Sequence, residues 1–414
     1  MEVAEDIVIV GGGVAGLATS LGLHRLGIRS IVLEASDDLR SAGYALATFT
    51  NAWKALDALG IGDLLRQHHK RLHGNVTKSA ISGLQTSELP FQAKGKHSGD
   101  HEVRCLKRKL LLEALAKELP TGTIRYSSKV VNIEESGFFK LLHLADGTIL
   151  KTKVLVGSDG VNSVVANWLG FKKPAFAGRY AIRGSVDFKR SHGFEPKFMQ
   201  FFGKGIRSGA IPIDDTTIYW FITWTPSTRE EELEQDPAKV KQLLLSKLGK
   251  VPDEVRAIIE SSELDGFIAL PLRYRHPWEL LWGNISKGNV CVAGDALHPL
   301  TPDIGQGGCS ALEDSVVLAR CLGEALLKKP TGETKEKGEK EKDEYERIVM
   351  GLKKYARERA WRSIELISVS YISGIIQESQ GKMMTSLRDN ALVGFLAGFL
   401  LKMADFDCGK LIIS

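Results

Sequence analysis

The sequence predicts an α/β fold with three parts: a Rossmann-type dinucleotide-binding domain built from separated segments, a second domain formed by an antiparallel sheet, and a helical C-terminal region. Three observations predict these parts. A glycine-rich turn joins strand-like and helix-like segments near the N-terminus, aromatic and β-branched runs fill residues 178–224, and helical spacing continues over 345–402. A chain of 414 residues also exceeds what one hydrophobic core usually serves.

The first element is a βαβ unit. Residues 7–10 form a short β-branched run, 14–26 show helical spacing of apolar residues that ends at Gly27, and 31–33 form the next strand. A strand, turn, helix and strand in this order imply parallel strands joined by a right-handed crossover. The chain therefore opens as a Rossmann-type domain.

Later segments return to this domain after excursions into other structure. We expect a helix over 106–119, strands over 154–156 and 289–293, and a helix over 308–327. Strand-like segments over 73–91 and 178–224 form the antiparallel sheet. We assign 1–72, 101–175 and 285–330 to the dinucleotide-binding domain, 73–100 and 176–284 to a substrate-binding β-sheet domain, 328–344 to a flexible charged loop, and 345–414 to a helical C-terminal region.

The charged loop and the C-terminal region are predicted from composition and spacing. Residues 328–344 are dominated by Lys, Glu, Gly and Thr, and such a segment buries too little apolar surface to fold. Residues 345–402 are expected to be mostly helical. The possible breaks in this helix are Gly351, Gly374, Gly381 and Gly394.

Composition favours a globular protein and argues against nucleic-acid binding, a disulfide framework and a metal site. With 43% hydrophobic and 25% charged residues the chain is globular, and its net charge of +5 includes no long basic run that would favour nucleic acid. Five cysteines without a CxxC pair argue against a disulfide framework or a metal site and favour the cytoplasm. The apolar stretch 391–401 is shorter than the roughly 20 residues that span a bilayer, so a core or surface helix is expected there.

The first chemical motif is the glycine run at residues 11–16, which satisfies GxGxxG. Its glycines allow a tight turn, close approach to a pyrophosphate and tight packing of the following helix, whose N-terminus attracts phosphate. Glu34 ends the second strand, where an acid binds a ribose hydroxyl and repels a 2′-phosphate. FAD or NAD is therefore expected at this site, and NADP is not; a glycine-rich surface loop is the alternative.

A second motif lies far downstream, over residues 294–302 and 305–307. Asp295 follows a strand, where its carboxylate can bind a ribityl or ribose hydroxyl. The amides of residues 305–308 open a helix and can meet the negative charge of a reduced flavin ring. A dehydrogenase that uses only a nicotinamide has no need of this motif, so the cofactor expected is FAD.

With these two motifs and a DG motif at Asp159-Gly160 followed by Ser163, the chain resembles the group A, p-hydroxybenzoate-hydroxylase-like flavoprotein monooxygenases over nearly its whole length. The resemblance implies that the DG motif serves both FAD and the passing nicotinamide. It also implies that Arg108 reaches the FAD pyrophosphate, although a solvated Lys/Arg cluster is the alternative. Ala166 departs from the family, which usually has Arg at that position.

Within the family the chain is most similar to the plant salicylate-hydroxylase-like monooxygenases, through Arg40, Gly43, residues 51–53 and residues 406–411, and more distantly to zeaxanthin epoxidase. This resemblance does not identify salicylate as the substrate. The residues expected to bind FAD are Gly11, Gly13, Val14, Ala15, Gly16, Glu34, Ala35, Arg40, Arg108, Val131, Asp159, Gly160, Asp295, Pro302, Gly305, Gln306, Gly307 and Gly308.

The resemblance further implies the reaction. NADPH or NADH reduces FAD, O2 forms a flavin C4a-hydroperoxide, and one oxygen hydroxylates or epoxidises a small aromatic or otherwise unsaturated substrate. The sequence has no second GxGxxG and therefore no separate Rossmann site for NAD(P)H. This agrees with the family, which uses NAD(P)H only transiently.

Two alternatives remain: another FAD oxidoreductase, such as a halogenase or prenyl reductase, and a flavin-binding regulatory protein without turnover. Residues 220–226 do not fit the WxWxIP signature of halogenases. The protein is expected to be a monomer or homodimer.

The substrate site is expected where the antiparallel sheet faces the flavin. The candidate catalytic residues are Pro299, His298 and Arg183. His298 can relay a proton beside the expected flavin ring, and a structural role is the alternative. Arg183 and Arg207 can hold a carboxylate or phenolate, or can instead face solvent or pair with Asp or Glu. Phe221 and Trp224 are three positions apart in one strand, so regular pairing prevents both from facing the pocket.

Overall fold

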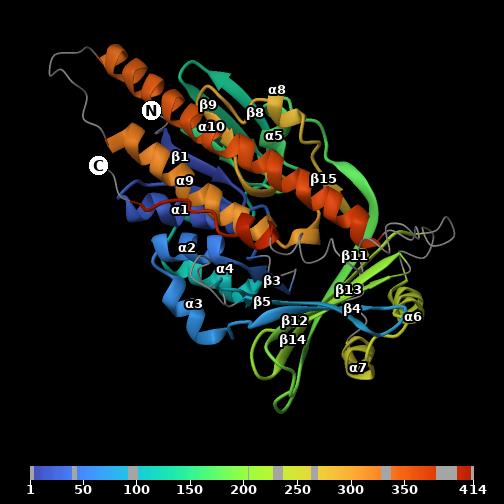
Figure 1. Ribbon diagram of the computed structural model, residues 1–414. Coiled ribbons are helices and arrows are strands. Elements are labelled where there is room, and N and C mark those ends of the chain that lie inside the picture. The colour runs from blue at the N-terminus through green and yellow to red at the C-terminus, as the bar shows by residue number, and fades with distance from the viewer. Residues whose placement is uncertain are drawn as a thin grey trace.

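The computed structural model describes residues 4–39, 44–91, 101–203, 205–226, 236–262, 269–327, 337–378 and 399–411. Two large sheets organise them, with the long helix α10 (Lys337–Glu378) lying outermost across the first sheet's helices (Figure 1). The predicted fold class is confirmed: an α/β domain built from separated segments carries a second, mainly antiparallel sheet and a helical C-terminal region.

The first sheet has the strand order β16-β17-β10-β1-β2-β7, in which β17 to β7 pair in parallel and β16 is an antiparallel edge strand. β9 and β8 extend the sheet from β10. Its strands are β1 (Glu5–Val10), β2 (Ile31–Leu33), β7 (Ile124–Arg125), β8 (Val130–Ser136), β9 (Phe139–Leu144), β10 (Ile149–Gly157), β16 (Ser286–Lys287) and β17 (Val290–Val292). Parallel strands are buried on both faces, which explains their nearly continuous apolar sequences. The sheet therefore joins segments from the start, middle and last third of the chain.

Helices cover this sheet and share its apolar core. α1 (Val14–Arg25) packs against α9 (Gly307–Leu327) and α4 (Arg108–Lys117), and α9 packs against α10 and α2 (Thr50–Ala58). The remaining elements are α3 (Gly62–His68), α5 (Val164–Trp168), α8 (Glu279–Trp282), the short 3-10 turns η3 (Gly294–Ala296) and η4 (Pro302–Ile304), and the paired strands β3 (Ala45–Thr48) and β6 (Arg104–Lys107).

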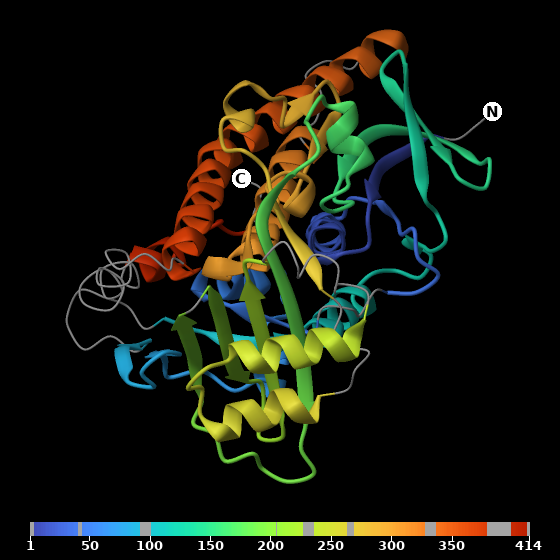
Figure 2. The same cartoon turned by 90° about the vertical axis from the view of Figure 1, so that its right-hand side faces the viewer.

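The second sheet has the order β15-β11-β14-β13-β12-β4-β5. Its strands are β4 (Gly74–Ser79), β5 (Gln85–Pro90), β11 (Ala175–Asp187), β12 (Lys197–Gly203), β13 (Ile206–Pro212), β14 (Thr217–Trp224) and β15 (Leu270–Tyr274). All neighbours pair antiparallel except β12 and β4. Helices α6 (Pro237–Lys247) and α7 (Asp253–Ser261) cover one face (Figure 2).

Side chains of β14 alternate between the two faces of this sheet. Trp220 and Trp224 pack into the core beneath α6 and α7. Tyr219 and Phe221 point to the opposite face and line a cavity. The prediction that Phe221 and Trp224 cannot both face the pocket is therefore confirmed.

Several predicted boundaries are wrong. Residues 106 and 107 end β6 rather than begin a helix, because this segment pairs with β3. The helix of residues 308–327 starts one residue earlier, at Gly307. Residues 337–344 belong to α10 instead of a charged loop: Lys153 binds Glu344 at 3.1 Å, and Tyr345 packs on Phe138, so tertiary contacts anchor a segment with no apolar face of its own.

Two of the four predicted helix breaks are also wrong, because α10 continues through Gly351 and Gly374. A Cβ at Gly351 would lie 2.8 Å from the carbonyl oxygen of Cys321, and a Cβ at Gly374 would collide with the guanidinium of Arg179. These glycines allow close packing rather than a bend. Gly381 and Gly394 lie outside the described residues.

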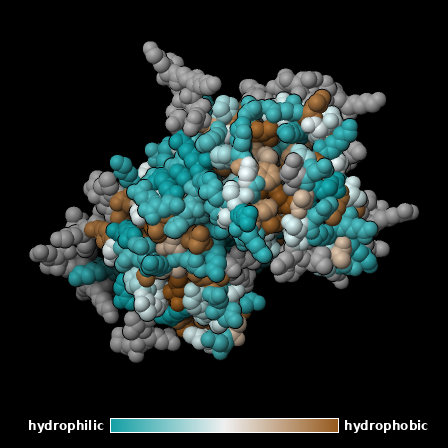
Figure 3. Space-filling view, turned by 90° about the horizontal axis from the view of Figure 1, so that it is seen from below, coloured by the Kyte–Doolittle hydropathy of each residue, from teal (hydrophilic) through white to brown (hydrophobic). Residues whose placement is uncertain are grey.

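The underside of the molecule is mostly hydrophilic, with apolar residues in several separate patches (Figure 3). In the part of the chain that the structure describes, no helix combines the length and the apolar character needed to cross a membrane. Most of the apolar stretch predicted at 391–401 falls outside that part. Its last residue, Leu401, is buried and packs beside β6 and β13.

Candidate active site

Two adjoining cavities open at the carboxyl ends of the parallel strands, where ligands bind in doubly wound sheets. The smaller cavity has a volume of about 460 Å³ and the larger about 710 Å³. They form one continuous site, because both are lined by Gly13, Arg108, Ser158, Gly160 and Asn162.

The glycine loop after β1 forms one wall. Gly11 has φ = +105°, and a Cβ there would collide with the carbonyl of Ser158 in the DG segment. A Cβ at Gly16 would collide with the carbonyl of Gly11, so this glycine packs α1 against the loop without lining a cavity. α1 begins at Val14 with no side-chain cap, which leaves its first amides available to an anion.

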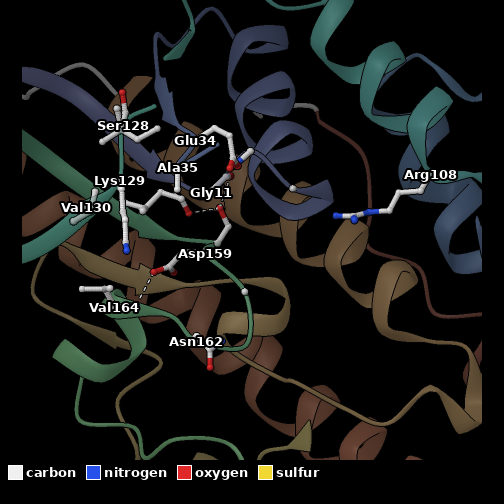
Figure 4. A pocket seen from close by; sticks show the side chains of 16 residues that line it. Gly11, Glu34, Ala35, Arg108, Ser128, Lys129, Val130, Asp159, Asn162 and Val164 are labelled. Atoms are coloured by element: carbon white, nitrogen blue, oxygen red, sulfur yellow. Dashed lines mark hydrogen bonds between the residues drawn. The ribbon is translucent and has the colours of Figure 1, made fainter. Parts of the chain in front are cut away.

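Glu34 closes the loop from the adjacent strand. Its carboxylate accepts hydrogen bonds from the amides of Gly12 and Ser36, both at 2.8 Å, and its side chain turns toward the glycine loop (Figure 4). Glu34 is buried, and it lines the smaller cavity together with Ala35. These hydrogen bonds tie the glycine loop to the end of β2.

The DG segment follows β10 on the other side of the loop. Asp159 accepts hydrogen bonds from the hydroxyl of Ser163 and, at 2.7 Å, from the amide of Val164, which starts α5 (Figure 4). Burial raises the pKa of Asp159 above its ordinary value. Ala166, where the family usually has Arg, is buried in the domain core and lines neither cavity.

The segment after β17 borders the larger cavity. Asp295 is exposed between the buried residues Gly294 and Ala296, and its side chain lines this cavity. Gly305 adopts φ = +66°, and α9 begins two residues later. The other predicted residues that line the larger cavity are Val14, Ala15, Pro302, Gln306, Gly307 and Gly308.

Several predicted residues lie elsewhere. Val131 is 49% exposed and points away from the site, whereas its neighbour Val130 lines the smaller cavity. The pairing of β8 with β9 is irregular between Val130 and Asn132. Pro299 and His298 are buried behind the cavity wall and line neither cavity. This position does not support His298 as a proton relay to a substrate. Arg40 lies outside the described residues.

His298 instead belongs to a buried network beneath the Gly294–Asp295 turn. Asp314 of α9 accepts hydrogen bonds from Nε2 of His298 at 2.6 Å and from the amide of Gly294 at 2.7 Å. Arg359 of α10 binds Asp314 at 2.6 Å and Glu313 at 2.8 Å. Asn51 donates to both Glu313 and Gln306, and so connects the network to the cavity wall.

The charges of this network compensate one another. Burial raises the pKa values of Asp314 and Glu313, but the cationic groups beside them and the hydrogen bonds outweigh burial and hold both values below the ordinary range. Both carboxylates therefore stay ionised in the interior. Sequence reasoning missed the network, because its partners lie on α2, α9 and α10.

The second sheet forms the far wall of the larger cavity. Arg207 is 3% exposed and donates to Gln200 at 3.0 Å, and its Nη1 lies 3.4 Å from Asp303. Arg179 forms a bidentate ion pair with Asp303 at 2.7 and 2.9 Å. The carboxylate of Asp303, in the η4 turn, therefore pairs with both arginines.

Arg183 differs from these arginines. It is half-buried and lines the larger cavity, and no ion pair holds it within the described part of the chain. Around it stand aromatic and apolar side chains from the sheet. Burial raises the pKa of the neighbouring Tyr219 to about 12, an effect that the positive charge of Arg183 partly opposes.

Other lining residues carried no sequence signal. The smaller cavity is also lined by Ser128, Lys129 and Asn162, and the larger by Asn75, Gln377, Leu400 and Leu401. Arg108 reaches in from α4, across the cavity from Lys129 and Asn162 (Figure 4). Only the folded chain brings these residues to one site.

Comparison with known proteins agrees with this geometry. Residues 4–337 match the family described as FAD binding domain. The chain is similar to Monooxygenase 2 of Arabidopsis thaliana, at 54% identity over 412 residues and 99% of each chain. It is similar to Monooxygenase 1 of the same plant, at 34% identity over 98% of this chain and 99% of that relative.

The fold also matches a solved structure. HpxO of Klebsiella pneumoniae, complexed with FAD and uric acid, shares the fold with a TM-score of 0.79 at 21% identity over 96% of each chain. The predicted resemblance to group A flavoproteins is confirmed. The chain belongs to the FAD binding domain family and is an FAD-dependent monooxygenase.

Proposed function

We propose that this monooxygenase uses NAD(P)H and O2 to hydroxylate a small aromatic substrate that carries a carboxylate or phenolate. The observation that carries the proposal is the position of Arg183, a cation without an ion pair among the described residues, in an otherwise largely apolar and aromatic cavity wall. A guanidinium in such a wall favours an anionic group and fixes its orientation.

The two cavities fit FAD in residue type. The smaller cavity offers the glycine loop, Glu34 and Arg108, a set suited to a ribose and a pyrophosphate. The larger cavity offers Asp295 and the amides of residues 305–308, a set suited to a ribityl chain and an anionic ring. FAD, when bound, supplies electron transfer from NAD(P)H and the activation of O2.

The chain's own residues would then orient the substrate and exclude water. Phe198, Tyr219 and Phe221 give the larger cavity an aromatic wall, on which a planar ring can pack. Arg207 already binds Gln200 and Asp303, so we assign it to holding the cavity wall and Arg183 to holding the substrate anion.

Five free, buried cysteines support a reducing compartment, and we propose the cytoplasm.

The test is aerobic oxidation of NADH and NADPH by the purified protein, with the flavin spectrum recorded. The panel contains phenols and aromatic acids, each with a neutral amide or ester counterpart. We expect oxidation that rises with one acid or phenol and yields a product one oxygen atom heavier. Stimulation by neutral compounds alone would reject the anionic substrate, and slow reduction with every compound would favour a flavoprotein without turnover.

A further inference from the structure

The short helix α8 exposes three large apolar side chains on one turn. Trp278, which precedes α8, and Leu281 and Trp282 within it are 54%, 54% and 81% exposed. Spacings of three and four residues place these side chains on the same side of the turn. Leu280 points the other way and is buried. A cluster of exposed tryptophan and leucine is uncommon on a monomeric protein and usually marks an interaction surface.

This turn is held firmly in place. The ring of Trp278 stacks on His276 with centroids 4.3 Å apart, and His276 packs on Tyr274 at 5.0 Å. The buried guanidinium of Arg275 donates to the carbonyl groups of Leu297 and Ala296, next to the turn that borders the larger cavity. The exposure of the apolar side chains is thus built into the fold and does not reflect a loose loop.

The chain segment of residues 171–176 runs beside α8 and adds positive charge. One nitrogen of Arg275, Nη1, lies 3.2 Å from the carbonyl oxygen of Lys172 and 3.4 Å from the carboxylate of Glu279. Residues 171–176 and 269–287 together contain five lysine or arginine residues and one acid. That acid, Glu279, is paired with Arg275, whereas Lys172 and Lys173 are exposed.

We propose that this surface, formed by Trp278, Leu281, Trp282, Lys172 and Lys173, docks the protein on an anionic lipid surface. Tryptophan favours the boundary between headgroups and acyl chains, and lysine is attracted to anionic headgroups. An apolar cluster bordered by lysines fits a peripheral contact of this kind. A stable interface with a second copy of the chain buries roughly 800 Å² on each partner. Three side chains on one turn are too few to bury this area.

The proposed lipid-binding surface lies next to the rim of the larger cavity. Strand β15 leads directly into it, and Leu270 and Arg273 of that strand are exposed and also line the larger cavity. Docking would therefore bring the rim of the cavity close to the lipid. Helices α6 and α7 lie at the far end of the molecule from α8 and would face away from the membrane (Figure 1).

The test is sedimentation of the FAD-loaded full chain with vesicles of phosphatidylcholine alone or mixed with phosphatidylserine. We expect binding to the mixed vesicles only, and weaker binding at high salt. The double variant Trp278→Gln/Trp282→Gln should lower vesicle affinity roughly tenfold or more, and Lys172→Gln/Lys173→Gln should lower it on mixed vesicles.

The matched control is Leu84→Gln, a 70% exposed apolar residue in the β4–β5 turn. Its neighbour Gly83 lies beside Lys250, between α6 and α7. It should bind vesicles like the wild type. All variants should retain FAD content and the wild-type melting temperature. Failure of the wild-type chain to bind mixed vesicles, or equal binding by the tryptophan variant, would overturn the proposal. So would a wild-type dimer in sedimentation velocity that the tryptophan variant abolishes.

Discussion

Asp314 lies 2.6 Å from Nε2 of His298, and both side chains are completely buried. The same carboxylate oxygen accepts the amide hydrogen of Gly294, so α9 holds the turn that presents Asp295 to the larger cavity. Arg359 binds the second oxygen of Asp314 from α10. The turn beside the proposed flavin site therefore depends on residues that line neither cavity.

Asp314→Asn should lower the free energy of unfolding by about 3–5 kcal/mol, because it leaves the buried Arg359 without one of its two carboxylates. Urea denaturation measures this loss. Asp405→Asn is the control: its partner Lys54 is at the surface, so the change should stay within about 0.5 kcal/mol. Equal effects of the two substitutions would contradict the role given to the network.

Acid should destabilise the protein through the same carboxylates. The pKa values of Asp314 and Glu313 are lowered in the folded state, since nearby cationic groups outweigh the effect of burial. A lowered folded-state pKa gives stability that is complete above the ordinary pKa of about 4 and is lost as the pH falls further. Melting temperatures should fall below about pH 4. The fall should be shallower in Asp314→Asn, and an unchanged slope would assign the acid sensitivity to other groups.

The sequence predicted those parts of the site that local motifs encode. The glycine loop, the DG segment and residues 305–308 are short stretches whose backbone shape follows from their glycines, and they line the cavities as expected. Their roles toward FAD stay predictions. His298 belongs to such a motif as well, but motif membership does not tell which way a side chain points, and this one points into the core.

Contacts between distant segments were beyond sequence reasoning. Val130 rather than Val131 lines the smaller cavity, and that choice depends on the register of β8 against β9. The charged start of α10 is predicted as a loop from its composition. The contacts that stabilise it, such as that of Lys153 with Glu344, come from another element and cannot be seen in the local sequence. The predicted domain boundaries likewise stay predictions.

Two glycines of α10 should respond oppositely to alanine. A Cβ at Gly374 would collide with Arg179, which forms the buried ion pair with Asp303, so Gly374→Ala should destabilise the protein by about 1–3 kcal/mol. Gly338 has open space around the same position, and Gly338→Ala should stabilise by up to about 1 kcal/mol through helix propensity. Urea denaturation tests both variants. Stabilisation by Gly374→Ala would show that Arg179 can move away at little cost.

Asp295→Ala should release most of the bound FAD. The carboxylate is exposed in the larger cavity, and loss of one charge-assisted hydrogen bond costs about 1.5–3 kcal/mol, or roughly tenfold or more in Kd. Fluorescence titration of the apoprotein with FAD measures this change. Asp146→Ala, in the turn between β9 and β10, is the control for loss of an exposed carboxylate. If the Asp295→Ala protein purifies with full flavin, Asp295 does not contribute to FAD binding.

Arg183→Met should separate anionic from neutral substrates. Removal of the guanidinium from the cavity wall takes away the proposed partner of a carboxylate or phenolate, a loss of about 1.5–3 kcal/mol for the charged compound. The KM of an anionic substrate should therefore rise roughly tenfold to a hundredfold, while that of its neutral counterpart stays the same. Arg190→Met, an exposed arginine just beyond the end of β11, controls for the loss of one positive charge. Because Arg183 makes no ion pair in the described part of the chain, the variant should keep its melting temperature and FAD content. An equal rise in KM for the charged and neutral compounds would mean that Arg183 shapes the cavity without binding the anion.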